Sequence, residues 1–143
     1  MTAIDWLCTS AECSPPLRVA QLLTCIFLAI LFLQSGIDKV TDRSGNLEWL
    51  TGHFAESPLA AFVPTMVTIV TVAELAAGTV CAVAVPALLI GDGGEAVAFY
   101  GIALSAISLI MLFFGQRMAK DYAGAAVLVP YFTLAIFGLW LFV

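Results

Sequence analysis

An acidic residue, Glu74, stands in the middle of TIVTVAELAAGTV (68–80), a stretch otherwise made of apolar and small residues. If this stretch is a helix, Thr71, Gly78 and Cys81 share a face with Glu74. A carboxyl group on such a small, polar face could bind a ligand or carry a proton. It could equally be a neutral, hydrogen-bonded acid whose only role is to specify how the helices pack.

Four further polar residues are candidates to act with Glu74 as ligand-binding residues: Arg18, Gln34, Lys39 and Tyr100. Arg18 would begin the first helix, and Glu74 would lie about 16 Å deeper at 1.5 Å per residue, so the two meet only if both side chains extend or the helices are offset. Gln34 and Tyr100 could hydrogen-bond the acid if their depths agree. Lys39 is most simply a snorkelling lysine that anchors the end of the first helix.

The four cysteines and the single histidine offer little redox or metal chemistry. Cys8 and Cys13 lie in the polar N-terminal segment, where a disulfide could form in an oxidising compartment. Their C-x4-C spacing differs from the C-x-x-C of thiol oxidoreductases. Cys25 and Cys81 are explained as small, buried apolar residues. Because His53 has no second ligand at metal-binding spacing, we predict no metal site.

The composition indicates which solvent surrounds the chain. Of the 143 residues, 62% are hydrophobic and 10% are charged, whereas a soluble domain is about 45–50% apolar and about 25% charged. This composition predicts an integral membrane protein, and the length allows a single domain over residues 1–143. The net charge of -5 and the lack of a basic run argue against a nucleic-acid partner.

Four apolar segments are long enough to cross a bilayer, because about 20 helical residues span about 30 Å of hydrocarbon. We expect these helices at about 17–36, 59–85, 96–115 and 124–143. The segments lack the alternation of apolar and polar residues found in barrel strands. The sequence therefore predicts an all-α fold, an integral membrane four-helix bundle.

The first connection, 37–58, is the longest, and its Leu47, Leu50 and Phe54 fall at helical spacing beside Trp49. A short amphipathic helix at the level of the lipid headgroups would explain this pattern. An ordinary loop with some buried apolar residues would explain it as well.

The distribution of basic residues predicts how the chain crosses the membrane. The N-terminal segment lacks a basic region and the apolar run after it is too long for a signal peptide, so we expect the first helix to stay as an anchor. Lys39, Arg43, Arg117 and Lys120 lie at one end of the predicted bundle, and Arg18 lies at the other. Because basic loops face the cytoplasm, both termini are expected outside it in a multi-pass arrangement.

Several short motifs follow one another in an order that is similar to a known family. An arginine begins the first helix, FLxSGIDK ends it, a tryptophan-bearing loop follows, and TVAELAAG lies in the second helix. Over almost the whole chain this pattern resembles the DoxX family of small four-helix bacterial membrane proteins, although that family does not require the N-terminal cysteines. The matching positions are Arg18, Gly36, Lys39, Glu74, Gly78, Lys120 and Asp121.

The resemblance implies a bacterial inner-membrane protein and limits its activity only loosely. Founding members of the family are associated with thiosulfate oxidation coupled to quinone, and others with sulfur and redox-stress partners. Many have no assigned activity, and similar four-helix proteins of animals act as assembly chaperones for membrane receptors. Because a fold does not fix a function, the resemblance alone does not choose among these roles.

Three functions stay open at this point. The chain could be a non-catalytic accessory subunit that packs against lipids and other membrane subunits of a redox complex and shapes a quinone or lipid site. This fits the lack of paired histidines for haem, and we expect no covalent cofactor. It could instead be a quinone-linked oxidoreductase component in which Glu74 relays a proton and Arg18 or Lys39 orients an oxygen. The third hypothesis is a small transporter or assembly factor. No catalytic set is visible, so the sequence leaves open whether the chain is an enzyme.

Overall fold

The computed structural model describes residues 14–91 and 93–143, and all regular structure within these residues is helical. The expected Cys8 to Cys13 disulfide lies outside the described residues. The helices are α1 (Pro15–Thr41), α2 (Arg43–His53), α3 (Val63–Ile90), α4 (Gly94–Met118) and α5 (Tyr122–Trp140), with a short 3-10 turn, η2 (Ala60–Phe62), directly before α3.

Four of these helical segments are long and apolar enough to cross a membrane: α1, the η2–α3 segment, α4 and α5. The predicted all-α four-helix membrane bundle is confirmed, and the chain is a small membrane protein with four apolar helices. Two predicted helix ends were wrong. α1 continues past Gly36 to Thr41, and α3 continues past Val85 to Ile90 with Pro86 inside it. A polar residue near a helix end can project towards headgroups or a partner, so the end of an apolar run does not end the helix.

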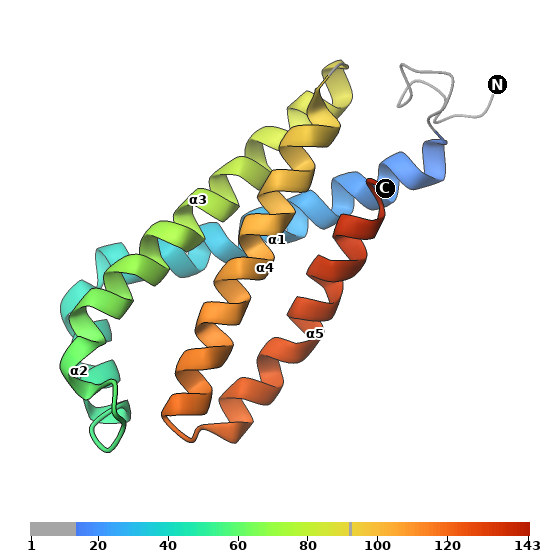
Figure 1. Cartoon of the computed structure of the whole chain (residues 1–143). Helices are drawn as coiled ribbons and strands as arrows, with labels where there is room; N and C mark the ends of the chain where they lie inside the picture. Colours follow the sequence, from blue (N-terminus) through green and yellow to red (C-terminus); the bar gives the residue numbers. More distant parts are fainter. Residues whose placement is uncertain (1–13, 92) are drawn as a thin grey trace.

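The four long helices are arranged with α3 between α1 and α4, while α5 packs on α4 (Figure 1). Small residues allow close approach at these contacts. A Cβ atom added at Gly78 of α3 would lie 2.8 Å from the backbone nitrogen of Leu33 in α1. One added at Gly101 of α4 would lie 3.0 Å from the backbone nitrogen of Cys81 in α3. The backbone of α3 is therefore in near contact with both neighbouring helices.

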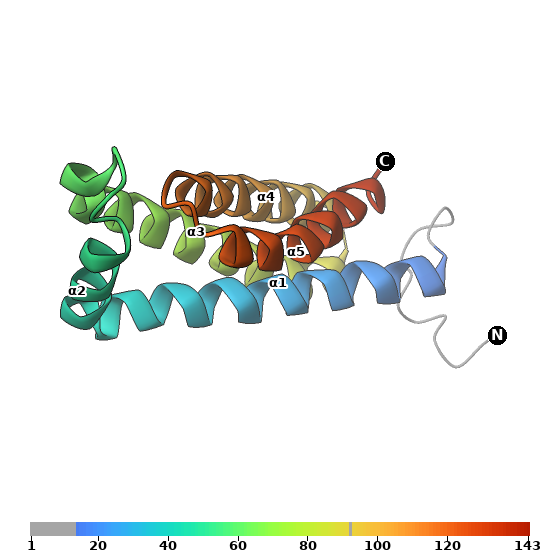
Figure 2. The same ribbon diagram turned by 90° about the horizontal axis from the view of Figure 1, so that it is seen from below.

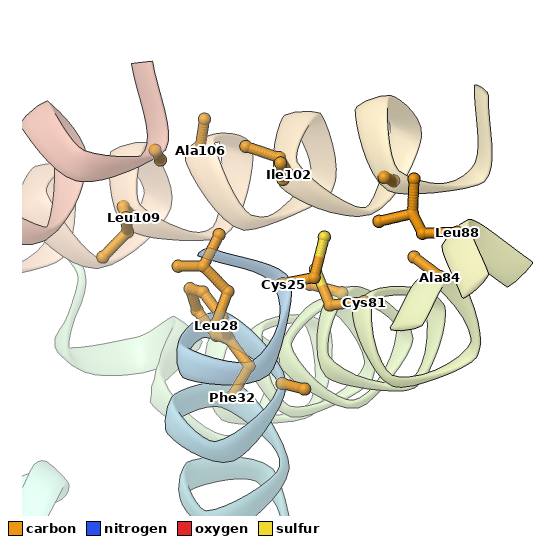
Figure 3. Close-up of a cluster of buried hydrophobic side chains, with 13 residues drawn as sticks. Cys25, Leu28, Phe32, Cys81, Ala84, Leu88, Ile102, Ala106 and Leu109 are labelled. Carbon is orange, nitrogen blue, oxygen red and sulfur yellow. The ribbon is translucent and has the colours of Figure 1, made fainter. Parts of the chain in front are cut away.

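The main hydrophobic core fills the space between α1, α3 and α4. Figure 3 shows side chains of the three helices pointing towards one another in this core. Cys25 and Cys81 are fully buried there as free cysteines, which confirms their interpretation as small apolar residues. The other labelled members are Leu28, Phe32, Ala84, Leu88, Ile102, Ala106 and Leu109.

The short helix expected in the first connection is present as α2. The side chain of Asp42 caps it by accepting a hydrogen bond of 3.1 Å from the backbone nitrogen of Gly45. α2 contains no buried residue, and it lies across the end of α1 (Figure 2). Its Leu47 and Leu50 pack against a small second core around Phe54. The apolar contacts of α2 with the bundle therefore come from one side of the helix.

Candidate functional site

Glu74 lies at the centre of the candidate site and is completely buried in α3. Thr71, Gly78 and Cys81, which share its helix face, are buried as well. The inward orientation expected for this stripe is therefore confirmed. The hydroxyl of Thr71 donates to the carbonyl of Val67 in its own helix, so the partners of Glu74 come from elsewhere.

Two side chains of α1, Ser35 and Lys39, hold the Glu74 carboxylate. Lys39 Nζ lies 2.9 Å from Glu74 Oε2 as an ion pair and donates a hydrogen bond of 3.2 Å to Oε1. Ser35 Oγ also donates to Oε1, at 3.1 Å. Lys39 Nζ in turn donates to Ser35 Oγ at 2.7 Å and to the Ser35 carbonyl at 3.3 Å. The three residues form one connected polar cluster between α1 and α3.

The packing of α1 on α3 explains why these side chains meet. Ser35 and Lys39 are four residues apart and so share one face of α1. Between them Gly36 lies against Leu75, so closely that an added Cβ would come within 2.7 Å of the leucine side chain. With the helices this close, even the short side chain of Ser35 reaches the carboxylate.

The location of Lys39 corrects its interpretation as a snorkelling anchor. Its side chain is only 17% exposed and points inward to Glu74. A buried carboxylate offers the ammonium group a countercharge, and leaving either group alone in an apolar interior is costly. The SGIDK motif pointed to a polar cluster at this position, because the spacing from Ser35 to Lys39 places a hydroxyl and an ammonium group side by side on a helix.

The other three candidate residues lie away from Glu74. Arg18 is buried at the opposite end of the bundle, where its guanidinium forms an ion pair of 3.0 Å with Glu95 at the start of α4. Gln34 and Tyr100 are exposed, and no hydrogen bond joins either to Glu74 within residues 14–91 and 93–143. The sequence could not settle these pairings, because they depend on the relative depths of different helices.

An apolar cavity of about 100 Å³ adjoins the Lys39 side of the cluster. Leu50 and Phe54 form its wall on the α2 side, while α3 and α4 contribute further apolar side chains such as Val67 and Met111. Among the described residues, Lys39 is the only charged one that lines it. The cavity thus combines an apolar surface with an ammonium group whose charge is balanced by Glu74.

His53, for which the sequence predicts no metal-binding role, belongs to a second polar cluster beside this cavity. Its Nε2 lies 3.1 Å from Gln116 Oε1, and Gln116 lines the cavity. The same nitrogen lies 3.7 Å from Asp121 Oδ2, which is within ion-pair range when the ring is protonated. The ring of Trp49 stacks on the imidazole with 4.8 Å between centroids. Among the described residues no group of three or more His, Cys, Asp or Glu side chains gathers as a metal site.

Comparison of the chain with protein-family models, curated proteins and solved structures finds no match. The similarity to the DoxX family therefore rests on the sequence motifs alone. Of the positions that carry it, Lys39 and Glu74 contact each other, and Gly36 and Gly78 lie at the α1–α3 contact that brings them together. Arg18, which also belongs to the pattern, lies at the other end.

Proposed function

We propose that this chain is a DoxX-like bacterial inner-membrane protein that binds the polar head of a quinone or lipid beside Lys39, as a non-catalytic subunit of a larger membrane redox complex. The observation that carries the proposal is the apolar cavity in which Lys39 is the only charged lining residue within residues 14–91 and 93–143. Ligand sites are commonly apolar pockets with a few placed polar groups, and this cavity has that character.

The electrostatics of the cavity favour a head group that is neutral and accepts hydrogen bonds. Glu74 already balances the charge of Lys39, so a second anion would lie close to a buried carboxylate. Lys39 Nζ has three protons, and its longest hydrogen bond, 3.3 Å to the Ser35 carbonyl, is the one that a ligand oxygen could replace. Quinone carbonyls and lipid ester carbonyls both fit this requirement.

The exposed surface of α5 supports the subunit role. In the most apolar stretch of α5, 18 residues long, only 17% of the residues are buried. In the corresponding stretches of the other three membrane helices, 33–39% of the residues are buried. Large side chains such as Phe137 and Trp140 are left uncovered. A helix with so much of its surface uncovered has room for lipid or for a helix of another subunit.

A second candidate function assigns proton transfer to Glu74. The acid is completely buried, but Lys39 and Ser35 connect it by hydrogen bonds to the cavity wall. A proton could therefore move between Glu74 and a ligand in the cavity through Lys39. The transporter hypothesis gains less support, because the apolar core around Leu28 and Ile102 lies between the Lys39 cluster and the Arg18 ion pair.

The experiment is purification of the native complex in a gentle detergent, followed by mass spectrometry of co-eluting proteins and of extracted quinones and lipids. We expect stoichiometric redox subunits and retained quinone or lipid with the wild-type chain. The variant Lys39→Met should lose the retained molecule, whereas Lys120→Met, in an exposed turn, should keep it. A wild-type chain that purifies alone, without quinone or specific lipid, would refute the proposal.

Substitution of Glu74 separates the two candidate functions. Glu74→Gln keeps a side chain that accepts the Ser35 and Lys39 hydrogen bonds but cannot carry the acidic proton, and it also removes the countercharge of Lys39. If the chain only shapes the site, the intact complex should keep both its quinone and its turnover. Retained quinone with turnover reduced at least tenfold would instead favour proton transfer through Glu74.

A further inference from the structure

The size of the cavity limits what can enter it without movement of its walls. Its volume is about 100 Å³, smaller than an engineered apolar cavity of about 150 Å³ that holds a benzene molecule. A substituted quinone ring or a lipid ester is larger than benzene. If the site encloses the whole head group of such a ligand, one wall of the cavity has to move.

The walls of α3 and α4 are poorly suited to that movement. The two helices are in near contact at Gly101, where an added Cβ would touch the backbone and side chain of Cys81. They share the main hydrophobic core, and at the α3–α4 turn Gly94 lies directly against the backbone of Ala87. Separation of α3 from α4 would therefore break the core.

The wall formed by α2 is held much more weakly. α2 has no buried residue, and only Leu47 and Leu50 of the helix itself pack on the second core. A single residue, Asp42, separates the end of α1 from the start of α2, and its backbone angles (φ -117°, ψ 57°) interrupt the helical path there. At that end Arg43 makes an exposed hydrogen bond of 2.8 Å to Thr68 of α3.

The opposite end of α2 is fastened by His53. Its contacts with Gln116 at the end of α4 and Asp121 at the start of α5 join α2 to the turn between these helices. Asp121 is itself fixed, because its Oδ1 accepts a hydrogen bond of 2.8 Å from the backbone nitrogen of Gly124 as the cap of α5. Trp49, stacked on the imidazole, holds the ring in this orientation.

We propose that α2 is a hinged lid over the cavity, that His53 latches it onto Gln116 and Asp121, and that an amphipathic ligand enters sideways from the membrane surface when the latch opens. The hinge is the link at Asp42, and the moving wall carries Leu50 and Phe54, so the contacts of the buried Phe54 with Val63 and Val67 open together with the latch. The identity of the ligand rests on the proposed function, whereas the movement of the lid does not. Figure 2 shows α2 at one end of the molecule, across the end of α1.

The first test is hydrogen exchange, measured by mass spectrometry on the full chain in lipid nanodiscs. In His53→Ala we expect the amides of Arg43–His53 to exchange about three- to tenfold faster, the effect of one lost hydrogen bond of ordinary strength. The amides of α3 and α4 should be unchanged. Thr51→Ala, an exposed change on the same helix, is the matched control, and His53→Gln should restore slow exchange by offering an amide to Gln116.

The second test measures access to the cavity without any natural ligand. Met111→Cys places a thiol in the α4 wall, in a chain with Cys8→Ser and Cys13→Ser, and a maleimide probes its reactivity. The same chain without Met111→Cys measures any reaction of the buried Cys25 and Cys81. We expect His53→Ala to raise the labelling rate about three- to tenfold and Thr51→Ala to leave it unchanged.

The outcomes separate the lid from the proposed ligand. Faster exchange in α2 together with faster labelling supports the lid, even if the wild-type chain retains no quinone or lipid. Unchanged exchange in α2, equal acceleration in α3 and α4, or an unchanged labelling rate would overturn it. If the wild-type chain retains quinone but any of these three results is obtained, the proposed function is supported and the lid is not.

Discussion

Lys39 Nζ lies 2.9 Å from Glu74 Oε2 across the contact of α1 with α3, and both side chains are largely shielded from solvent. An ion pair in such a position does not add much stability by itself, because burial of two charges is costly. Loss of one partner, however, leaves the other charge uncompensated. The pair therefore favours the one arrangement of α1 against α3 in which Lys39 and Glu74 meet.

Removal of one partner should destabilise the chain more than removal of both. We expect Glu74→Leu to lower the free energy of unfolding in detergent by about 2–4 kcal/mol, somewhat less than a fully enclosed pair, because Lys39 can partly turn outward. Adding Lys39→Met to Glu74→Leu should recover most of this loss, since an apolar pair fits the apolar surroundings. Thermal unfolding of the two variants measures the difference. If both variants melt together, the pair is not coupled as described.

The cluster of Ser35, Lys39 and Glu74 can form only if α1 and α3 approach closely. Gly78 allows this approach because it has no side chain. Gly78→Ala places a Cβ 2.8 Å from the Leu33 backbone nitrogen, so the helices have to separate. We expect a loss of about 1–3 kcal/mol in unfolding free energy. Gly52→Ala is the matched control, because nothing lies within 4 Å of its added Cβ. That control should be neutral or stabilising by about 0.5–1 kcal/mol within a helix. Equal melting of the two variants would contradict a tight contact at Gly78.

The inward stripe of α3 was predictable because it depends only on local sequence. Hydropathy identifies the membrane helices, and the helical period of 3.6 residues places Thr71, Glu74, Gly78 and Cys81 on one face. The direction of Lys39 was not predictable in the same way. The apolar run ends near Gly36, so the helix was expected to end there, and a lysine beyond a helix end has no fixed direction.

The second polar cluster was beyond sequence reasoning for a different reason. His53 and Gln116 are 63 positions apart, and Asp121 follows only after the next turn. Each is an ordinary polar residue near the end of a helix, and no local pattern links them. Their meeting depends on where α2 folds back relative to the turn between α4 and α5, which is a property of the tertiary structure.

The end of α5 is fastened to α1 by one buried hydrogen bond, and its loss should loosen α5 selectively. Gln21 Nε2 donates to the carbonyl of Leu141 at 2.8 Å, 120 positions away. In Gln21→Leu we expect residues 131–143 to exchange amide hydrogens about three- to tenfold faster, with the core of α3 unchanged. Gln34→Leu makes the same substitution on the exposed side of α1 and should leave α5 unchanged. An equal response of α5 to both variants would show that this hydrogen bond does not hold it.

The orientation of the chain can be tested because the two ends of the bundle differ in charge. Lys39 and Arg43 lie at the junction of α1 and α2, Arg117 and Lys120 lie at the turn between α4 and α5, and Arg18 lies in the first turn of α1. Figure 1 shows α2 and the α4–α5 turn towards one end of the bundle, and the start of α1 and the C-terminus towards the other. Four spans place both termini on one side, and the basic end is expected in the cytoplasm. Alkaline phosphatase, active only outside the cytoplasm, should therefore be active when fused after Val143 and inactive when fused after Lys120.

A green fluorescent protein fused at the same two positions should give the reverse pattern, because it fluoresces when it folds in the cytoplasm. The latch of His53 would then face the cytoplasm, and any control of the lid by a partner would act from that side. If the phosphatase is active after Lys120 and inactive after Val143, the bundle is inverted. The lid would in that case open on the outer surface, and its partners would have to be sought there.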